Sequence, residues 1–138
     1  MRLLIAVAFF TLSIVIGVVP SATQQHKSEQ HIGIKEYEAF HRVLHPLQHE
    51  ALPKKDFETI RKNADELLLK GNSIVDLGVP AGINEDNRAR FESELQNFSS
   101  RLKSLVRNAK EGSDAQLKES FDGVHDSFEL LASLLPQA

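Results

Sequence analysis

Six histidines are the side chains in this sequence best suited to bind a metal ion. Five of them fall within residues 26–49, and the sixth is His125. His41, His45 and His49 follow one another at intervals of four residues, and residues at this spacing lie on one side of an α-helix. Neutral imidazole is a ligand for copper, zinc, nickel and iron. The spacing therefore predicts that neighbouring histidines of this row converge on one transition-metal ion.

The rise of a helix limits how many of the three histidines can bind the same ion. At about 1.5 Å per residue, the outer two would lie about 12 Å apart, so we expect two of the three to be ligands. His125 borders the core of the final helix, beside Val124. We expect His45, His49 and His125 to be the best ligands of a copper or zinc ion, with His41 next. Protons compete for imidazole, so binding should weaken below about pH 6.5.

Two observations bear on other kinds of function. The chain has no cysteine, which excludes disulfides, thiolate metal sites and thiol catalysis. It also has no nucleophile elbow, no phosphate-binding glycine loop and no HExxH motif, so the sequence does not indicate an enzyme. Histidines at the edge of a helix seam can also be ordinary solvated side chains. In that case the domain would be a ligand-free interaction module.

The N-terminal segment has the pattern of an export signal. Arg2 is followed by a run from Leu3 to Val19 without charge and then by small residues around Ser21 and Ala22, which is typical of a cleavable signal peptide over residues 1–22. If it were not cleaved, the 17-residue run would be a membrane anchor at the lower limit of length. We expect the rest of the chain to be periplasmic or secreted, and free of the membrane after cleavage.

Charge argues against nucleic acid as a partner. Removing residues 1–22 takes away Arg2 and no acidic residue, which leaves 15 basic and 19 acidic side chains and a net charge of −4. A protein that binds nucleic acid needs basic side chains to neutralise phosphates. We therefore expect no nucleic-acid partner for the mature protein.

Apolar residues at helical spacing predict four helices after a polar tether at residues 23–33. We expect the helices at about residues 34–51, 53–77, 84–112 and 113–135. Pro46 should kink or divide the first helix, and Pro53 suits the first turn of the second. Asn84 should cap the third, and Ser113 with Gln116 form a capping box for the fourth. Short loops and a seven-residue repeat then predict an all-α fold, an antiparallel up-down-up-down four-helix bundle over residues 34–138.

One segment of the final predicted helix resembles a known family. Residues 121–128, FDGVHDSF, resemble the haem motif CxxCH-D-x-F of the cytochrome c′ family, with Phe121 and Val124 at the cysteine positions and His125 at the haem-ligating histidine. The resemblance also extends to the soluble b-type cytochromes of the same bundle fold. It implies haem b as an alternative cofactor, held without covalent attachment, and a homodimer formed through exposed faces of the first two helices. Without the cysteines, we interpret the chain as a relative whose histidines bind a metal ion.

Overall fold

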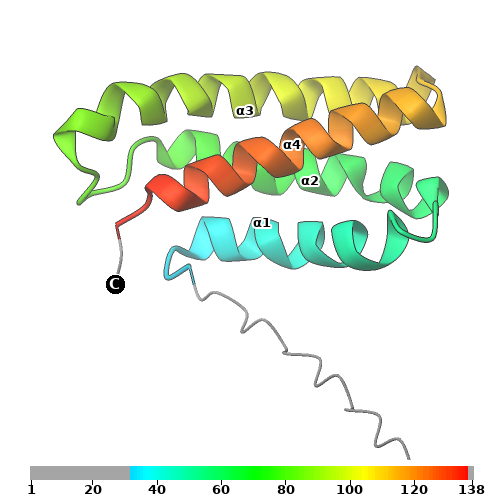
Figure 1. Cartoon of the computed structure of the whole chain (residues 1–138), viewed down its shortest axis with the longest axis horizontal. Helices are drawn as coiled ribbons and strands as arrows, with labels where there is room; N and C mark the ends of the chain where they lie inside the picture. Colours follow the sequence, from blue (N-terminus) through cyan, green and yellow to red (C-terminus); the bar gives the residue numbers. More distant parts are fainter. Residues whose placement is uncertain (1–31, 137–138) are drawn as a thin grey trace, which may run out of the picture.

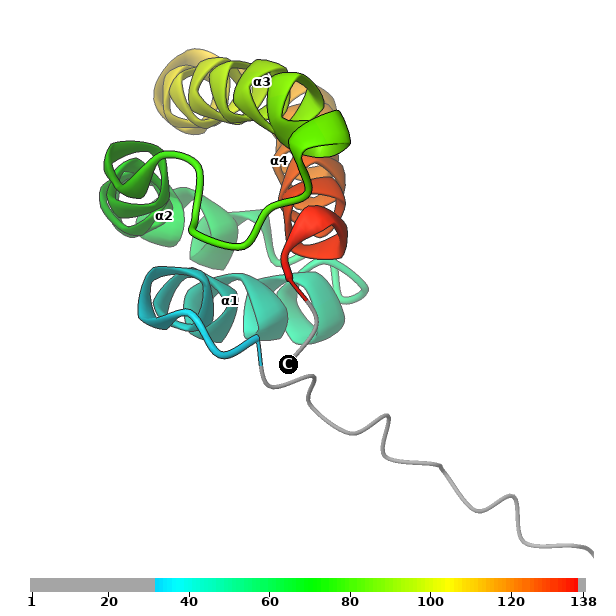
Figure 2. The ribbon, with the colours of Figure 1, turned by 90° about the vertical axis from the view of Figure 1, so that its left-hand side faces the viewer.

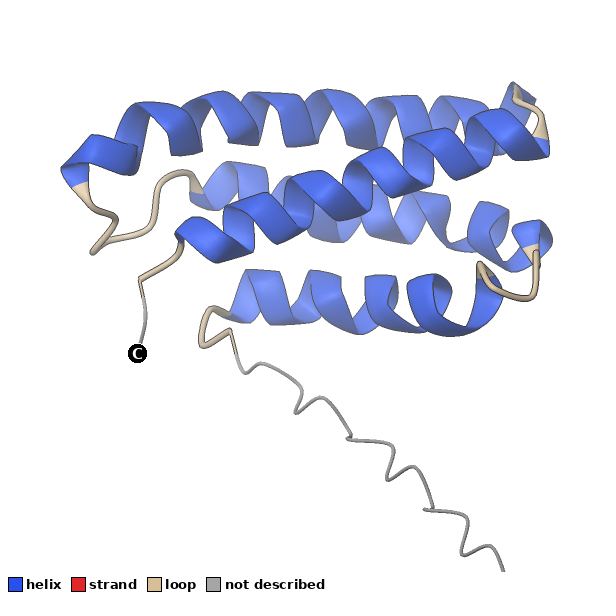
Figure 3. Ribbon diagram, in the orientation of Figure 1, coloured by secondary structure: helices blue, strands red, loops and turns tan. Residues whose placement is uncertain are grey.

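The computed structural model describes residues 32–136, which form four α-helices and one π-helical segment. The elements are α1 (Lys35–Pro46), η1 (Leu47–Ala51), α2 (Phe57–Leu77), α3 (Glu85–Glu111) and α4 (Asp114–Leu134). Helices and loops make up all of this part of the chain (Figure 3). The predicted signal peptide and most of the predicted tether lie outside the described residues, as do His26 and His31.

Consecutive helices run in opposite directions, as the colours of Figure 1 show. Seen end-on, the four helices surround a common centre in chain order, so that α4 lies beside α3 and closes the bundle towards α1 (Figure 2). The all-α four-helix architecture expected from the periodicity is therefore confirmed. None of the helices within residues 32–136 is both long enough and apolar enough to cross a membrane.

The predicted apolar stripes form a continuous core in the centre of the bundle. Each helix contributes fully buried side chains at three- and four-residue intervals. The largest are aromatic and come from α1, α3 and α4: Tyr37, Phe40, Phe91, Phe98, Phe121 and Phe128. The helical pattern thus located the core correctly, except at the C-terminal end of α2. There Leu77, the last residue of α2, is 42% exposed, and Gly78 follows it with φ 69°.

The prediction that the second helix begins at Pro53 is wrong. Residues 53–55 form a turn, and α2 begins at Phe57. Asp56 caps the helix, since its carboxylate accepts hydrogen bonds from the Thr59 backbone N–H at 3.1 Å and from the Thr59 hydroxyl at 2.7 Å. These two bonds lower the pKa of Asp56. A carboxylate that can satisfy free N–H groups is a stronger start signal than proline.

The other predicted helix starts are confirmed. The Asn84 side chain accepts a bond from the Asp86 backbone N–H at 3.0 Å. Ser113 and Gln116 form a reciprocal capping box at the start of α4, with bonds of 2.9 and 3.2 Å. Both caps satisfy N–H groups that have no partner within the helix, so they define where α3 and α4 begin.

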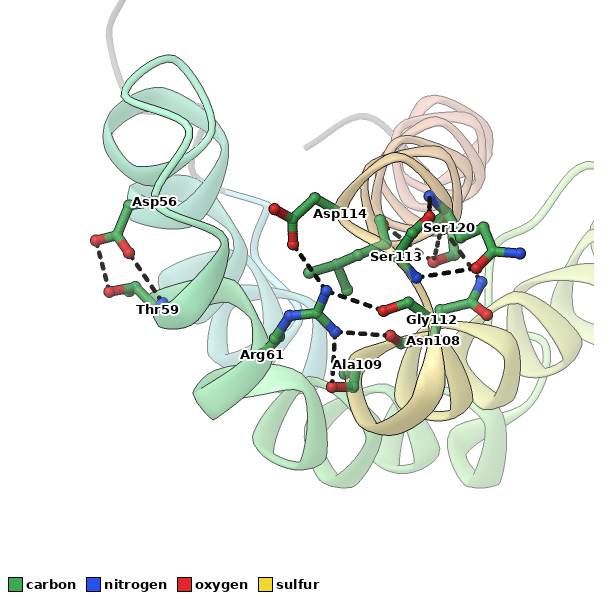
Figure 4. A network of polar contacts seen from close by, with 11 residues as sticks. Asp56, Thr59, Arg61, Asn108, Ala109, Gly112, Ser113, Asp114 and Ser120 are labelled. Carbon is green, nitrogen blue, oxygen red and sulfur yellow. Dashed lines mark hydrogen bonds and ion pairs between the residues drawn. The ribbon is translucent and has the colours of Figure 1, made fainter.

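The side chain of Arg61 on α2 forms hydrogen bonds at the connection between α3 and α4 (Figure 4). Its guanidinium donates hydrogen bonds of 3.0 Å to the carbonyl oxygens of Asn108, Ala109 and Gly112, and it pairs with Asp114 at 2.8 Å. The last carbonyls of a helix lack partners within the helix and carry partial negative charge. One cation from a neighbouring helix therefore caps the end of α3 and holds the start of α4.

Gly71 allows α2 and α3 to pack closely, because its missing side chain leaves room for Leu102. A methyl group on Gly71 would overlap the Cδ1 atom of buried Leu102 on α3. We expect Gly71→Ala to lower the free energy of unfolding by about 1–3 kcal/mol, although alanine favours a helix more than glycine does by about 1 kcal/mol. Urea unfolding followed by circular dichroism measures the change.

Gly123 provides the matched control within a second helix. A methyl group there would meet only the end of the flexible, exposed side chain of Arg101, at 2.9 Å from Nη1. Gly123→Ala should therefore keep or raise the stability. A Gly71→Ala protein as stable as the Gly123→Ala protein would contradict the close contact between Gly71 and Leu102.

Candidate metal centre

The three predicted histidines of the first helix form a row of neighbouring rings. The ring centroids of His41 and His45 are 5.2 Å apart, and those of His45 and His49 are 4.4 Å apart. His41 and His45 belong to α1, whereas His49 lies in η1. Neighbouring rings of the row therefore lie close together in the described structure, with centroids no more than 5.2 Å apart.

Pro46 marks a change of helix type between the two pairs. It has no N–H, so the carbonyl of Arg42 cannot receive the usual bond from residue i+4, and the regular α-helix ends there as predicted. The chain does not break but continues as a π-helical turn, with the Leu52 N–H bonded to the Leu47 carbonyl at 2.9 Å. A π-helix places more residues in each turn than an α-helix does. The change of helix type lies between His45 and His49.

The spacing of the rings matches that of two imidazoles on one metal ion. With metal–nitrogen distances of about 2.0–2.1 Å, two ring centroids are roughly 4.5 Å apart at a right angle and roughly 5.2 Å apart at a tetrahedral angle. The two pairs in this row have centroid separations of 4.4 and 5.2 Å. In their centroid separation, both pairs therefore resemble two imidazoles that share one ion.

The environment of the histidines changes along the row. His45 and His49 are exposed, whereas His41 is partly buried. The His41 ring stacks on Phe128 of α4, with centroids 6.1 Å apart and an angle of 17° between the rings. The pair with the best access to an ion from solution is therefore His45 with His49.

His125 does not join this row. It lies about one turn before Phe128 on α4. Its ring nitrogens are instead near two carboxylates of its own helix, Asp126 at 3.5 Å and Glu129 at 4.0 Å. Within residues 32–136, no group of three or more His, Asp or Glu side chains is arranged to hold one ion.

A groove on the other flank of α1 was missed by the sequence analysis. It has a volume of about 400 Å³ and lies between the α1–η1 segment and the beginning of α2. Its apolar wall includes Val43, Leu47 and Ala51, and Arg42 and Glu66 are among its charged side chains. Contact between two helices creates this groove, and the only signal in the sequence was the irregularity expected at Pro46. It contains no histidine and is separate from the row.

Tyr37 of α1 is a buried polar residue close to Phe128. Its side chain is 0% exposed, and its hydroxyl has no hydrogen-bond partner in the described structure. Its ring lies 6.0 Å from that of Phe128. Burial raises the pKa of the Tyr37 phenol, because the charged form would lose its hydration. The hydroxyl therefore stays protonated in the folded protein.

Tyr37→Phe should increase the stability by roughly 1 kcal/mol, since it removes a buried hydroxyl without a partner. The effect should grow above about pH 10, where the phenol ionises in the unfolded chain but not in the folded protein. The chain has one tyrosine and no tryptophan, so phenolate absorbance reports on this residue alone. The phenolate absorbance should appear at the same pH at which the protein loses its helical circular dichroism. A phenol that titrates while the helices remain folded would contradict the burial.

The segment that resembles cytochrome c′ has a mixed environment. Phe121 and Val124, at the cysteine positions of the motif, are both 0% exposed and contribute to the core. The side chain of His125 is 26% exposed.

Comparisons of the chain with family models, curated proteins and solved structures found no match.

Proposed function

We propose that this protein reversibly binds one divalent transition-metal ion, copper or zinc, through His45 and a neighbouring histidine of the row, of which His49 is the more exposed. The observation that carries the proposal is the 4.4 Å separation of two exposed imidazole rings on one face of the α1–η1 segment. Imidazole nitrogen is a ligand that both ions accept readily. Two such rings at chelating distance bind an ion more tightly than either ring alone, because the second ring is already in place.

The number of protein ligands favours buffering or sequestration over a structural or catalytic role. Structural zinc sites have four protein ligands, and catalytic sites usually have three. A pair of exposed histidines leaves the other positions to water, so an ion can enter and leave without unfolding the protein. The predicted export signal agrees with such a role in a periplasmic or secreted protein.

Haem b has less support as the ligand. Phe121 and Val124 occupy core positions between the helices, where a porphyrin beside His125 would need space. The nearest polar partners of His125 are carboxylates on the surface of α4, Asp126 and Glu129. Protein isolated from haem-replete cells should accordingly lack a Soret band, and a Soret band that is lost in His125→Ala would reverse this preference.

The experiment measures Cu²⁺ and Zn²⁺ affinity by competition with a coloured chelator. The full chain carries His26→Ala and His31→Ala, so that histidines outside the described residues do not contribute. We expect one ion per chain, and His45→Ala should weaken binding by at least about 10-fold. His45 is exposed, so this variant should keep its helical circular dichroism.

His125→Ala is the matched control, since it removes a histidine outside the row whose side chain is 26% exposed. It should leave the affinity within about 2-fold, because the ring nitrogens of His125 lie near Asp126 and Glu129 of its own helix. Binding that is equally weakened by His125→Ala would instead support a site that joins α1 and α4. A protein that binds neither ion, or that binds equally well without His45, would refute the proposal and favour an interaction module.

A further inference from the structure

We infer that His45 is shared by two overlapping chelates, and that the geometry preferred by the ion decides whether His41 or His49 is the second ligand. This inference rests on the proposed function. His45 is the middle member of the row and the only one whose ring neighbours both others, at 5.2 Å from His41 and 4.4 Å from His49. An ion on one pair uses His45, so the second pair cannot hold another ion at the same time.

The two pairs differ in the separation of their ring centroids. The separation between His45 and His49 is close to the roughly 4.5 Å expected at a right angle, which is typical of square-planar or tetragonal Cu²⁺. The separation between His41 and His45 equals the roughly 5.2 Å expected at the tetrahedral angle of Zn²⁺. Cu²⁺ should therefore select the pair that includes His49, and Zn²⁺ the pair that includes His41.

A change of helix type lies between the two pairs. The first pair lies within α1, and the second spans the junction between α1 and η1 at Pro46. Stacking on Phe128 also holds the His41 ring on the α4 side of the row. One row of identical ligands thus has two different centroid separations.

Sharing His45 also allows an ion to change position without leaving the protein. The bond to His41 breaks and a bond to His49 forms, or the reverse, while the bond to His45 remains. Two imidazoles are ligands before and after the exchange, and no electron is transferred. An ion that moves in this way stays bound while its other ligands exchange with solvent, which suits a protein that accepts and releases metal.

The test compares single and double variants of the row in the full chain with His26→Ala and His31→Ala. Affinity and stoichiometry are measured separately with Cu²⁺ and Zn²⁺. We expect one ion per chain, and His45→Ala should weaken binding of both ions by as much as the double variant His41→Ala/His49→Ala. His49→Ala should weaken Cu²⁺ binding by about 10-fold and Zn²⁺ binding by less. His41→Ala should have the opposite preference.

Several outcomes would overturn the inference while leaving the proposed function intact. If the same outer histidine is essential for both ions, the row holds one fixed chelate. Two ions per chain would mean that His45 is not shared. The proposed function fails separately, when the unaltered row binds neither ion or when His45→Ala has no effect. Tetragonal Cu²⁺ resonance spectra that persist in His41→Ala and change in His49→Ala would give independent support for the assignment of copper.

Discussion

Phe128→Ala should lower the free energy of unfolding by about 3–5 kcal/mol, the largest effect that we expect from a single substitution. Phe128 is 1% exposed and contacts three rings of α1. Its centroid lies 4.9 Å from Phe40, 6.0 Å from Tyr37 and 6.1 Å from His41. Removing the ring leaves a cavity where α4 meets α1 and deprives His41 of its stacking partner. Urea unfolding measures the loss.

Phe128→Leu is the matched control, because it keeps an apolar side chain of similar size in the core. It should cost less than about 1.5 kcal/mol. Binding of Cu²⁺ by the His45 and His49 pair should be preserved in this variant, since neither ring contacts Phe128 in the described structure. Equal losses for alanine and leucine would mean that ring contacts, and not the filled volume, hold α1 to α4.

Arg61→Ala should have the second largest effect, a loss of roughly 2–4 kcal/mol. The substitution removes three hydrogen bonds to carbonyl oxygens at the end of α3 and the ion pair with Asp114. Hydrogen bonds to a charged group are each worth more than neutral ones, and the Arg61 side chain is only 27% exposed. Denaturant unfolding measures the loss, and hydrogen exchange should show that the last turn of α3 opens first.

Two further variants separate the carbonyl bonds from the ion pair. Arg61→Lys keeps the charge but lacks the planar set of donors that reaches several oxygens at once, so it should recover only part of the stability. Asp114→Asn removes only the ion pair, and the Asp114 side chain is 63% exposed, so its cost should be below about 1 kcal/mol. If Asp114→Asn cost as much as Arg61→Ala, the ion pair would be the main contribution.

Local signals in the sequence were sufficient to predict the helices. The seven-residue repeat of apolar residues in α3 and α4 places the same residues in the core whatever their neighbours are. The caps at Asn84 and Ser113 act within four residues of the chain, so their effect can be anticipated from the sequence. The row formed by His41, His45 and His49 is also local, because all three belong to one continuous helical segment.

Tertiary structure decided what the sequence left open. Whether His125 joins the row depends on how far α4 lies from α1 and on how the ring turns. Asp126 and Glu129 on its own helix are its nearest charged partners. The stacking of His41 on Phe128, the contact of Gly71 with Leu102 and the reach of Arg61 to α3 all join residues far apart in the chain. Periodicity defines which face of a helix is buried, but the distance and rotation between helices follow from how all the core side chains fill the space together.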